Sequence, residues 1–110
     1  MWNNRTVSVV FPTYNEKDSM RASIEDFFAS GFVDEIVVVN NNAVQGTDQE
    51  VRKTQARLVY EMRQGYGYAI QKGLREAVGD YLIISEPDGT FSGRDVVKLL
   101  AYADDFDYVL

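Results

Sequence analysis

The feature that most constrains this chain is a repeated alternation of β-branched apolar runs with segments of helical spacing. Residues 7–11 (VSVVF) are almost uniformly apolar and stop at Pro12, as expected of a strand buried on both faces of a parallel sheet. The next segment carries apolar side chains on one helical face and has Gly31 as its stop. These side chains are Met20, Ile24, Phe27 and Phe28. A strand followed by a helix is therefore predicted.

The pattern then repeats. Residues 36–39 predict a second buried strand. Thr47, with Glu50 three residues later, predicts a capping box for a helix that runs to about Arg57. A short third strand is predicted at residues 58–60.

A third helix is marked by Ile70, Leu74 and Val78, and Gly79 is expected to end it. Beside these residues runs a ridge of small side chains that would let the helix lie close against a sheet. The ridge consists of Ala69, Gly73 and Ala77.

The last unit begins with a predicted fourth strand at residues 81–84. Ser92 and Asp95 predict a second capping box, and residues 108–110 the start of a fifth strand. The face of the fourth helix is expected to carry Val96, Val97, Leu100 and Ala103.

Strict strand–helix alternation predicts an α/β fold of βαβ units with right-handed crossovers. Its sheet should be mainly parallel, with helices on both faces. No repeat, linker or low-complexity segment divides the sequence, so residues 1–110 are expected to form one domain.

Composition narrows the chemistry. The chain has no cysteine and no histidine, which leaves hard, oxygen-ligated cations such as Mg²⁺ or Mn²⁺ as the expected metals. A formal charge of −6 argues against a nucleic-acid partner. The sequence shows neither a secretory signal nor an apolar run of membrane-spanning length, so a cytoplasmic location is expected.

Ligands of such sheets bind beyond the carboxyl ends of the strands, where the strand order reverses. The loops to inspect are therefore residues 12–16, 40–43 and 85–89. In the last loop, Glu86 and Asp88 are separated by Pro87 and followed by Gly89. Two such carboxylates can hold one Mg²⁺ or Mn²⁺, which would in turn bind a diphosphate. The alternative is an ordinary polar turn.

The other loops leave alternatives open. Tyr14 can stack on a base, and Glu16 can accept from ribose hydroxyls or simply occupy the first turn of a helix. The asparagines at 40–42 suit a base edge but are also common turn residues. Gly65 and Gly67 can bring backbone N–H groups to a phosphate or can serve packing alone. Neither the dinucleotide fingerprint nor the P-loop motif is present.

Three segments resemble the family-2 glycosyltransferases, which are inverting enzymes of the GT-A fold. They are residues 7–16 (VSVVFPTYNE), 35–47 (EIVVVNNNAVQGT) and 65–91 (GYGYAIQKGLREAVGDYLIISEPDGTF). The glycine pattern from Gly65 to Gly73 and the E-P-D-G-T stretch are most similar to the dolichyl- and polyprenyl-phosphate sugar transferase branch.

The resemblance implies a nucleoside diphosphate sugar donor, UDP- or GDP-linked. It also implies an acceptor hydroxyl or a polyprenyl phosphate, the latter at a membrane surface. Glu86 and Asp88 match the D-x-D motif for metal and diphosphate. The implied nucleotide-sugar contacts are Pro12, Thr13, Tyr14, Asn15, Glu16, Asn40, Asn41, Gly65, Gly67 and Asp88.

The sequence also departs from the family pattern. Asn40 stands where an aspartate commonly contacts the base, and Gln71 where a basic residue is frequent. Residues 43–45 (AVQ) replace the common Ser-Thr-Asp. No residue matches the general base of the family, so the catalytic residues are unassigned, and the domain is expected to be incomplete and inactive by itself.

The alternative is a non-catalytic nucleotide-binding or assembly module of the same fold. A nucleotidyltransferase is disfavoured because the loop at 12–16 lacks glycine and positive charge.

Overall fold

The computed structural model describes residues 1–103. Within these residues four strands and four helices alternate strictly. In chain order they are β1 (Val7–Thr13), α1 (Lys17–Ala29), β2 (Glu35–Asn40), α2 (Thr47–Arg52), β3 (Arg57–Tyr60), α3 (Tyr66–Glu76), β4 (Tyr81–Ile84) and α4 (Gly93–Ala103). The four strands lie where the apolar runs predict them, but the predicted stop at Pro12 is wrong, since β1 continues to Thr13 and Pro12 pairs with Val39 of β2. The predicted fifth strand at 108–110 lies outside the described residues.

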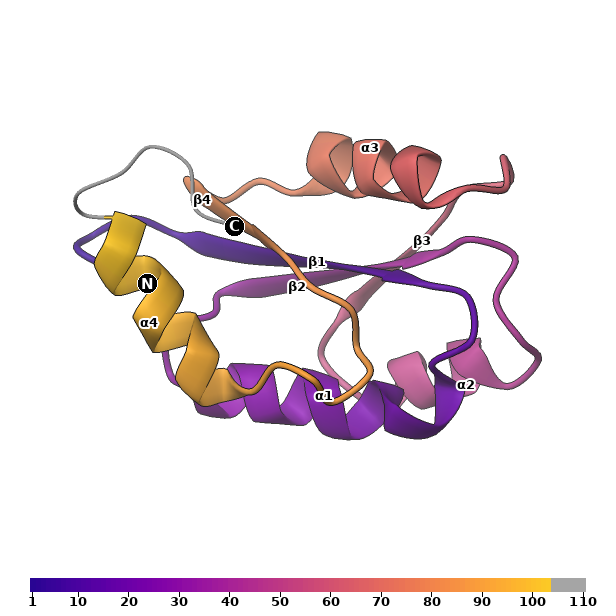
Figure 1. Ribbon diagram of the computed structural model, residues 1–110, viewed down its shortest axis with the longest axis horizontal. Helices are drawn as coiled ribbons and strands as arrows, with labels where there is room; N and C mark the ends of the chain where they lie inside the picture. The colour runs from indigo at the N-terminus through magenta and orange to yellow at the C-terminus, as the bar shows by residue number, and fades with distance from the viewer. Residues whose placement is uncertain (104–110) are drawn as a thin grey trace.

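The sheet has the order β3-β2-β1-β4, and every pair of neighbouring strands is parallel. Helix α3 covers one face, while α1, α2 and α4 lie on the other (Figure 1). The expected α/β fold with helices on both faces is thus confirmed. Because β2 and β3 extend the sheet on one side of β1 and β4 joins the other side, the strand order reverses between β1 and β4.

The core is divided by the sheet. Alternate residues of β1 point to opposite faces, so Val9 and Phe11 pack towards α1, whereas Val10 packs towards α3. The rings of Phe11 and Phe27 meet edge to face, with centroids 4.9 Å apart. The predicted face of α1 is confirmed, since Met20, Ile24 and Phe27 are buried and Phe28 packs against the same cluster.

Helix α3 lies unusually close to the sheet. A Cβ added at Gly73 would lie 2.2 Å from Cγ1 of Val10 and 3.2 Å from Cγ2 of Val39. Such distances leave no room for a larger residue, which confirms the close approach expected from the small-residue ridge. The helix ends at Glu76, three residues before Gly79. Gly79 has a different role, because a Cβ there would lie 2.8 Å from the backbone nitrogen of Ser8.

The predicted helix from Thr47 to about Arg57 is too long, and its capping box is wrong. Helix α2 ends at Arg52, since Arg57 already pairs with Val37 in the sheet. Gly46, with φ 95°, occupies the N-cap position, and the Thr47 hydroxyl donates to the Val44 carbonyl oxygen. Propensity could not reveal that sheet pairing overrides the helix.

The second capping box is formed in part. The Asp95 carboxylate accepts a hydrogen bond of 2.8 Å from the Ser92 backbone N–H, at the start of α4. On the predicted face of α4, Val96 and Leu100 are buried. Val97 is exposed, so that part of the predicted face is wrong.

Candidate functional site

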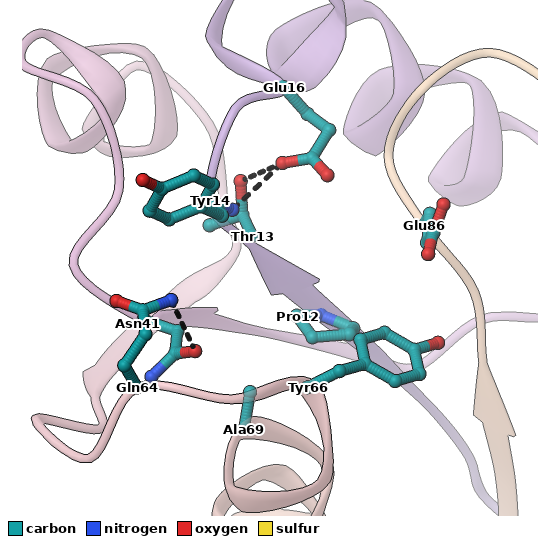
Figure 2. Close-up of a pocket in the computed structure, with 9 residues that line it drawn as sticks. All are labelled: Pro12, Thr13, Tyr14, Glu16, Asn41, Gln64, Tyr66, Ala69 and Glu86. Carbon is teal, nitrogen blue, oxygen red and sulfur yellow. Dashed lines mark hydrogen bonds between the residues drawn. The ribbon is translucent and has the colours of Figure 1, made fainter.

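A pocket opens at the carboxyl edge of the sheet, where the strand order reverses. It is lined from four separate segments by Pro12, Thr13, Tyr14, Glu16, Asn41, Gln64, Tyr66, Ala69 and Glu86 (Figure 2). A second hollow beside it is lined by Tyr66, Ile84, Ser85, Glu86, Asp88, Thr90 and Phe91. The structure therefore gathers most of the predicted contact residues around two hollows that share Tyr66 and Glu86.

The turn after β1 is closed by one carboxylate oxygen. Oε2 of Glu16 accepts hydrogen bonds from the Thr13 hydroxyl at 2.9 Å and from the Tyr14 N–H at 2.8 Å (Figure 2). It also accepts from the Asn15 N–H at 2.7 Å. Glu16 thus shapes the loop. The ring of Tyr14 is left 54% exposed beside the pocket, where a flat ligand can reach it.

Asn40 has both of its amide atoms engaged. Its Nδ2 donates to the Asp48 carboxylate at 2.7 Å, and its Oδ1 accepts from the Ala43 N–H at 2.7 Å. Asp48 also accepts from the Tyr60 hydroxyl at 2.7 Å. Asn40 does not line either hollow, so the structure does not bring it together with the other predicted contacts.

Asn41 is only 4% exposed and ties the β3–α3 loop to the end of β2. Its Nδ2 donates to the Glu61 carbonyl at 2.9 Å and the Arg63 carbonyl at 2.7 Å, and its Oδ1 accepts from the Gly65 N–H at 3.0 Å. Asn42, at φ 58°, adds bonds to the Met62 carbonyl and the Gln64 side chain. These amides hold the β3–α3 loop, which forms one wall of the pocket. A run of asparagines in the sequence does not predict this role.

Glu61 and Arg63 reinforce the same loop, and sequence reasoning did not assign them this role. The Arg63 guanidinium pairs with the Glu61 carboxylate at 3.1 Å and lies 4.4 Å from the centre of the Tyr68 ring. Hydrogen bonds from Arg63 lower the pKa of Glu61 to about 2. In the sequence, Glu61 and Arg63 are separated by one residue and look like ordinary surface charges. Their role in holding the loop is visible only in the fold.

At the start of α3, Gly65 has φ 145°, which side chains rarely adopt, whereas a Cβ at Gly67 would meet nothing within 4 Å. Gly65 is therefore required by its backbone and Gly67 is not. Between them, Tyr66 is half-exposed and borders both hollows. Burial and the charges of Glu86 and Glu16 raise the pKa of the Tyr66 hydroxyl, so it is protonated at neutral pH.

The loop after β4 carries the predicted metal ligands. The Pro87 carbonyl accepts from the Ser19 hydroxyl at 2.5 Å, and Gly89 has φ 84°. The Asp88 carboxylate accepts from the Thr90 N–H at 2.9 Å, and hydrogen bonds from Thr90 lower the pKa of Asp88. Burial, followed by the Asp88 and Glu16 carboxylates, raises the pKa of Glu86. Glu86 and Asp88 therefore lie close enough to repel each other.

This pair fits a hard divalent cation. Magnesium is commonly held by one or two carboxylates, with phosphate oxygens and water completing the shell. Within residues 1–103 no group of three or more acidic, histidine or cysteine side chains could hold a metal. The two carboxylates would thus supply part of a shell that a bound diphosphate completes.

The sheet topology and the pocket at the strand-order reversal define an α/β domain with a pocket at the carboxyl edge of a parallel sheet, where such sheets commonly bind ligands. Residues 8–110 match the family model described as "Glycosyl transferase family 2", and the chain belongs to this family.

Similar proteins agree with this assignment. Glycosyltransferase AglJ of Haloferax volcanii is 26% identical over 94% of this chain and 35% of the relative. Glucosyl-3-phosphoglycerate synthase of Mycobacterium tuberculosis, solved with Mn²⁺, UDP and glucosyl-3-phosphoglycerate, superposes with a TM-score of 0.81 at 24% identity, over 91% of this chain and 40% of that one.

The mannosyltransferase PcManGT of Pyrobaculum calidifontis, solved with GDP-mannose and Mn²⁺, superposes with a TM-score of 0.73 at 28% identity, over 84% of this chain and 30% of that one. The GT-A fold is thereby confirmed. The chain spans between 30% and 40% of the length of these proteins.

No helix among residues 1–103 has both the length and the apolarity needed to cross a bilayer.

Proposed function

We propose that this chain is the donor-binding part of a glycosyltransferase that transfers a sugar, with inversion, from a UDP- or GDP-linked donor to a hydroxyl or a lipid phosphate. One observation carries the proposal: the pocket beside Tyr14 and the hollow lined by Asp88 share two lining residues, Tyr66 and Glu86. A nucleoside diphosphate has the matching sequence of parts, namely a flat base, a ribose and a doubly charged diphosphate.

The base and ribose belong to the pocket side. Tyr14 stacks on the base, since its exposed ring borders the pocket while Glu16 fixes the backbone beneath it. Thr13, Asn15 and Pro12 contribute through the shape of that turn. Asn40 and Asn41 act mainly by holding the loops, because their amide atoms are engaged with the protein. Gly65 and Gly67 leave the start of α3 open to the donor.

The diphosphate belongs to the side of Glu86 and Asp88. Mg²⁺ or Mn²⁺ held there would neutralise the diphosphate and stabilise the charge that develops on the leaving nucleotide. Both carboxylates face the leaving side of the sugar, so neither is suited to deprotonate an acceptor on the opposite side. The general base is therefore sought outside residues 1–103, and we expect the 110-residue chain alone to transfer no measurable sugar.

The same proposal puts the reaction in the cytoplasm, at the membrane surface when the acceptor is a polyprenyl phosphate. The second candidate is a nucleotide-binding module without turnover. It is supported by the engagement of both Asn40 amide atoms with the protein, which leaves Asn40 fewer groups for a contact with the base.

Titration calorimetry tests the proposal. We expect the chain to bind UDP, GDP or their sugar esters more tightly with Mn²⁺ than with a chelator present, and Asp88→Asn to abolish that difference. Glu25→Gln is the control, since it removes an exposed carboxylate of α1 that pairs with Arg21 away from both hollows. Equal affinity with and without metal in the unmodified chain would exclude the cation site. A radiolabelled-sugar transfer assay separates the two candidates, since transfer by any protein that contains this domain supports the enzyme, and nucleotide binding without transfer supports the module.

A further inference from the structure

Tyr66 occupies the one place where the two hollows meet. It begins α3 and, with Glu86, is shared by the linings of both hollows. Its position is fixed from behind, because the preceding Gly65 donates its N–H to the buried Asn41 amide. Figure 2 shows the Tyr66 side chain reaching across the pocket, with its hydroxyl on the side where Glu86 lies.

The hydroxyl of Tyr66 is also uncommitted. Among residues 1–103 it has no hydrogen-bond partner. The Tyr66 residue is 52% exposed and belongs to neither core cluster. A tyrosine that served only to pack would turn its ring into one of these clusters. Here the ring instead borders open space and presents a free donor to it.

The charges around the two hollows suggest what this donor could bind. Glu16, Glu86 and Asp88 are acidic, and no lysine or arginine lines either hollow within the described part of the chain. A phosphate oxygen there would find no positive side chain to pair with. At neutral pH a phenol is a neutral hydrogen-bond donor, which can approach an anion among carboxylates without a charge of its own.

We propose that Tyr66 positions the diphosphate of the donor, with its hydroxyl donating a hydrogen bond to a phosphate oxygen between the base pocket and the Glu86–Asp88 loop. This inference rests on the proposed function. It adds a diphosphate contact that the glycines beside Tyr66 cannot supply, and Tyr66 is a positioning residue that takes no part in proton transfer.

The test separates the hydroxyl from the ring. Tyr66→Phe keeps the ring and removes only the donor, and Tyr68→Phe is the matched control, since Tyr68 lies two residues further along α3, packs on Arg63 and lines neither hollow. Binding of UDP and GDP with Mn²⁺ is measured by calorimetry, and binding of uridine and guanosine by NMR titration. Thermal melts establish that each variant is folded.

We expect Tyr66→Phe to weaken diphosphate binding about tenfold, the order expected when a hydrogen bond to a charged group is lost. Nucleoside binding should stay within about twofold of the unmodified chain, and Tyr68→Phe should change neither. Unchanged UDP and GDP affinity in Tyr66→Phe would overturn the inference, as would equal losses for nucleoside and diphosphate. If the unmodified chain binds neither UDP nor GDP with Mn²⁺, the proposed function itself fails.

Discussion

The two sides of the site are built in opposite ways. On the pocket side, the Asn41 amide and the Glu61–Arg63 pair tie the β3–α3 loop to the sheet, and the Glu61 carboxylate is neutralised by Arg63. On the other side, Glu86 and Asp88 repel each other, and the loop is held by the contact of Pro87 with Ser19 and the bond between Thr90 and Asp88.

This contrast shows how stability and binding are divided in the molecule. Removing a bond on the pocket side leaves buried polar groups without partners, which costs folding free energy. Removing the Glu86 carboxylate on the acidic side relieves repulsion, so we expect it to weaken ligand binding and not folding. The predictions below test whether the division holds.

Replacing Asn41 should have the largest effect on stability. Asn41→Ala strands the carbonyls of Glu61 and Arg63 and the Gly65 N–H, so we expect a loss of about 3 kcal/mol in the free energy of unfolding. Urea denaturation measures it. The matched variant Asn42→Gly tolerates the positive φ, removes only exposed hydrogen bonds and should lose less than about 1 kcal/mol. Equal losses would mean that burial of Asn41 is not what matters.

Gly73 tests whether the close packing of α3 supports the pocket side. Gly73→Ala forces a methyl group against Val10, and we expect a cost of about 1–3 kcal/mol in unfolding free energy. Gly67→Ala, in the same helix, meets open space and should be neutral or slightly stabilising. Calorimetric melting of both variants checks this, and a neutral Gly73→Ala would mean that α3 can shift away from the sheet.

Tyr14 should affect binding and not folding. We expect Tyr14→Ala to weaken binding of a nucleoside diphosphate by about 1–3 kcal/mol, the value of a stacked base, while Tyr14→Phe keeps the affinity. The ring is half-exposed, so the unfolding free energy should hardly change. Normal binding by the folded Ala variant would remove Tyr14 from the base site.

The smallest expected effects are those of pH. The pKa of Glu86 is raised above its ordinary value of 4.5, so its contribution to stability is present below pH 4.5 and is lost as the pH rises through the folded-state pKa. The pKa of Glu61 is lowered to about 2, so its contribution is present above pH 4.5 and is lost as the pH falls towards 2.

Because protons and cations compete for Glu86, Mn²⁺ affinity should also rise with pH just above 4.5. Urea unfolding and Mn²⁺ titration across this range measure both trends. Glu86→Gln should flatten the Mn²⁺ trend and leave the Glu61 contribution in place. Persistence of the Mn²⁺ trend in that variant would assign it to another carboxylate.

The sequence was sufficient for the strands, because β1 and β2 are buried and their apolar runs have few alternative explanations. It was insufficient where tertiary contacts decide. The end of α2 depends on Arg57 joining the sheet, and the structural role of Asn41 depends on a loop twenty residues further along the chain. Glu86 and Asp88 were predictable as a pair from their position after a strand, whereas the position of Tyr66 between the two hollows depends on the fold.

The anchoring of the β3–α3 loop by Asn41 also has a kinetic consequence. A wall that is already ordered need not be folded around the incoming nucleotide, so little conformational entropy is lost on association. Nucleotides that differ only in the base should then arrive at similar rates and differ in how long they remain bound. If the loop were less ordered, association would become slower, because the β3–α3 loop would have to fold before or during each binding event.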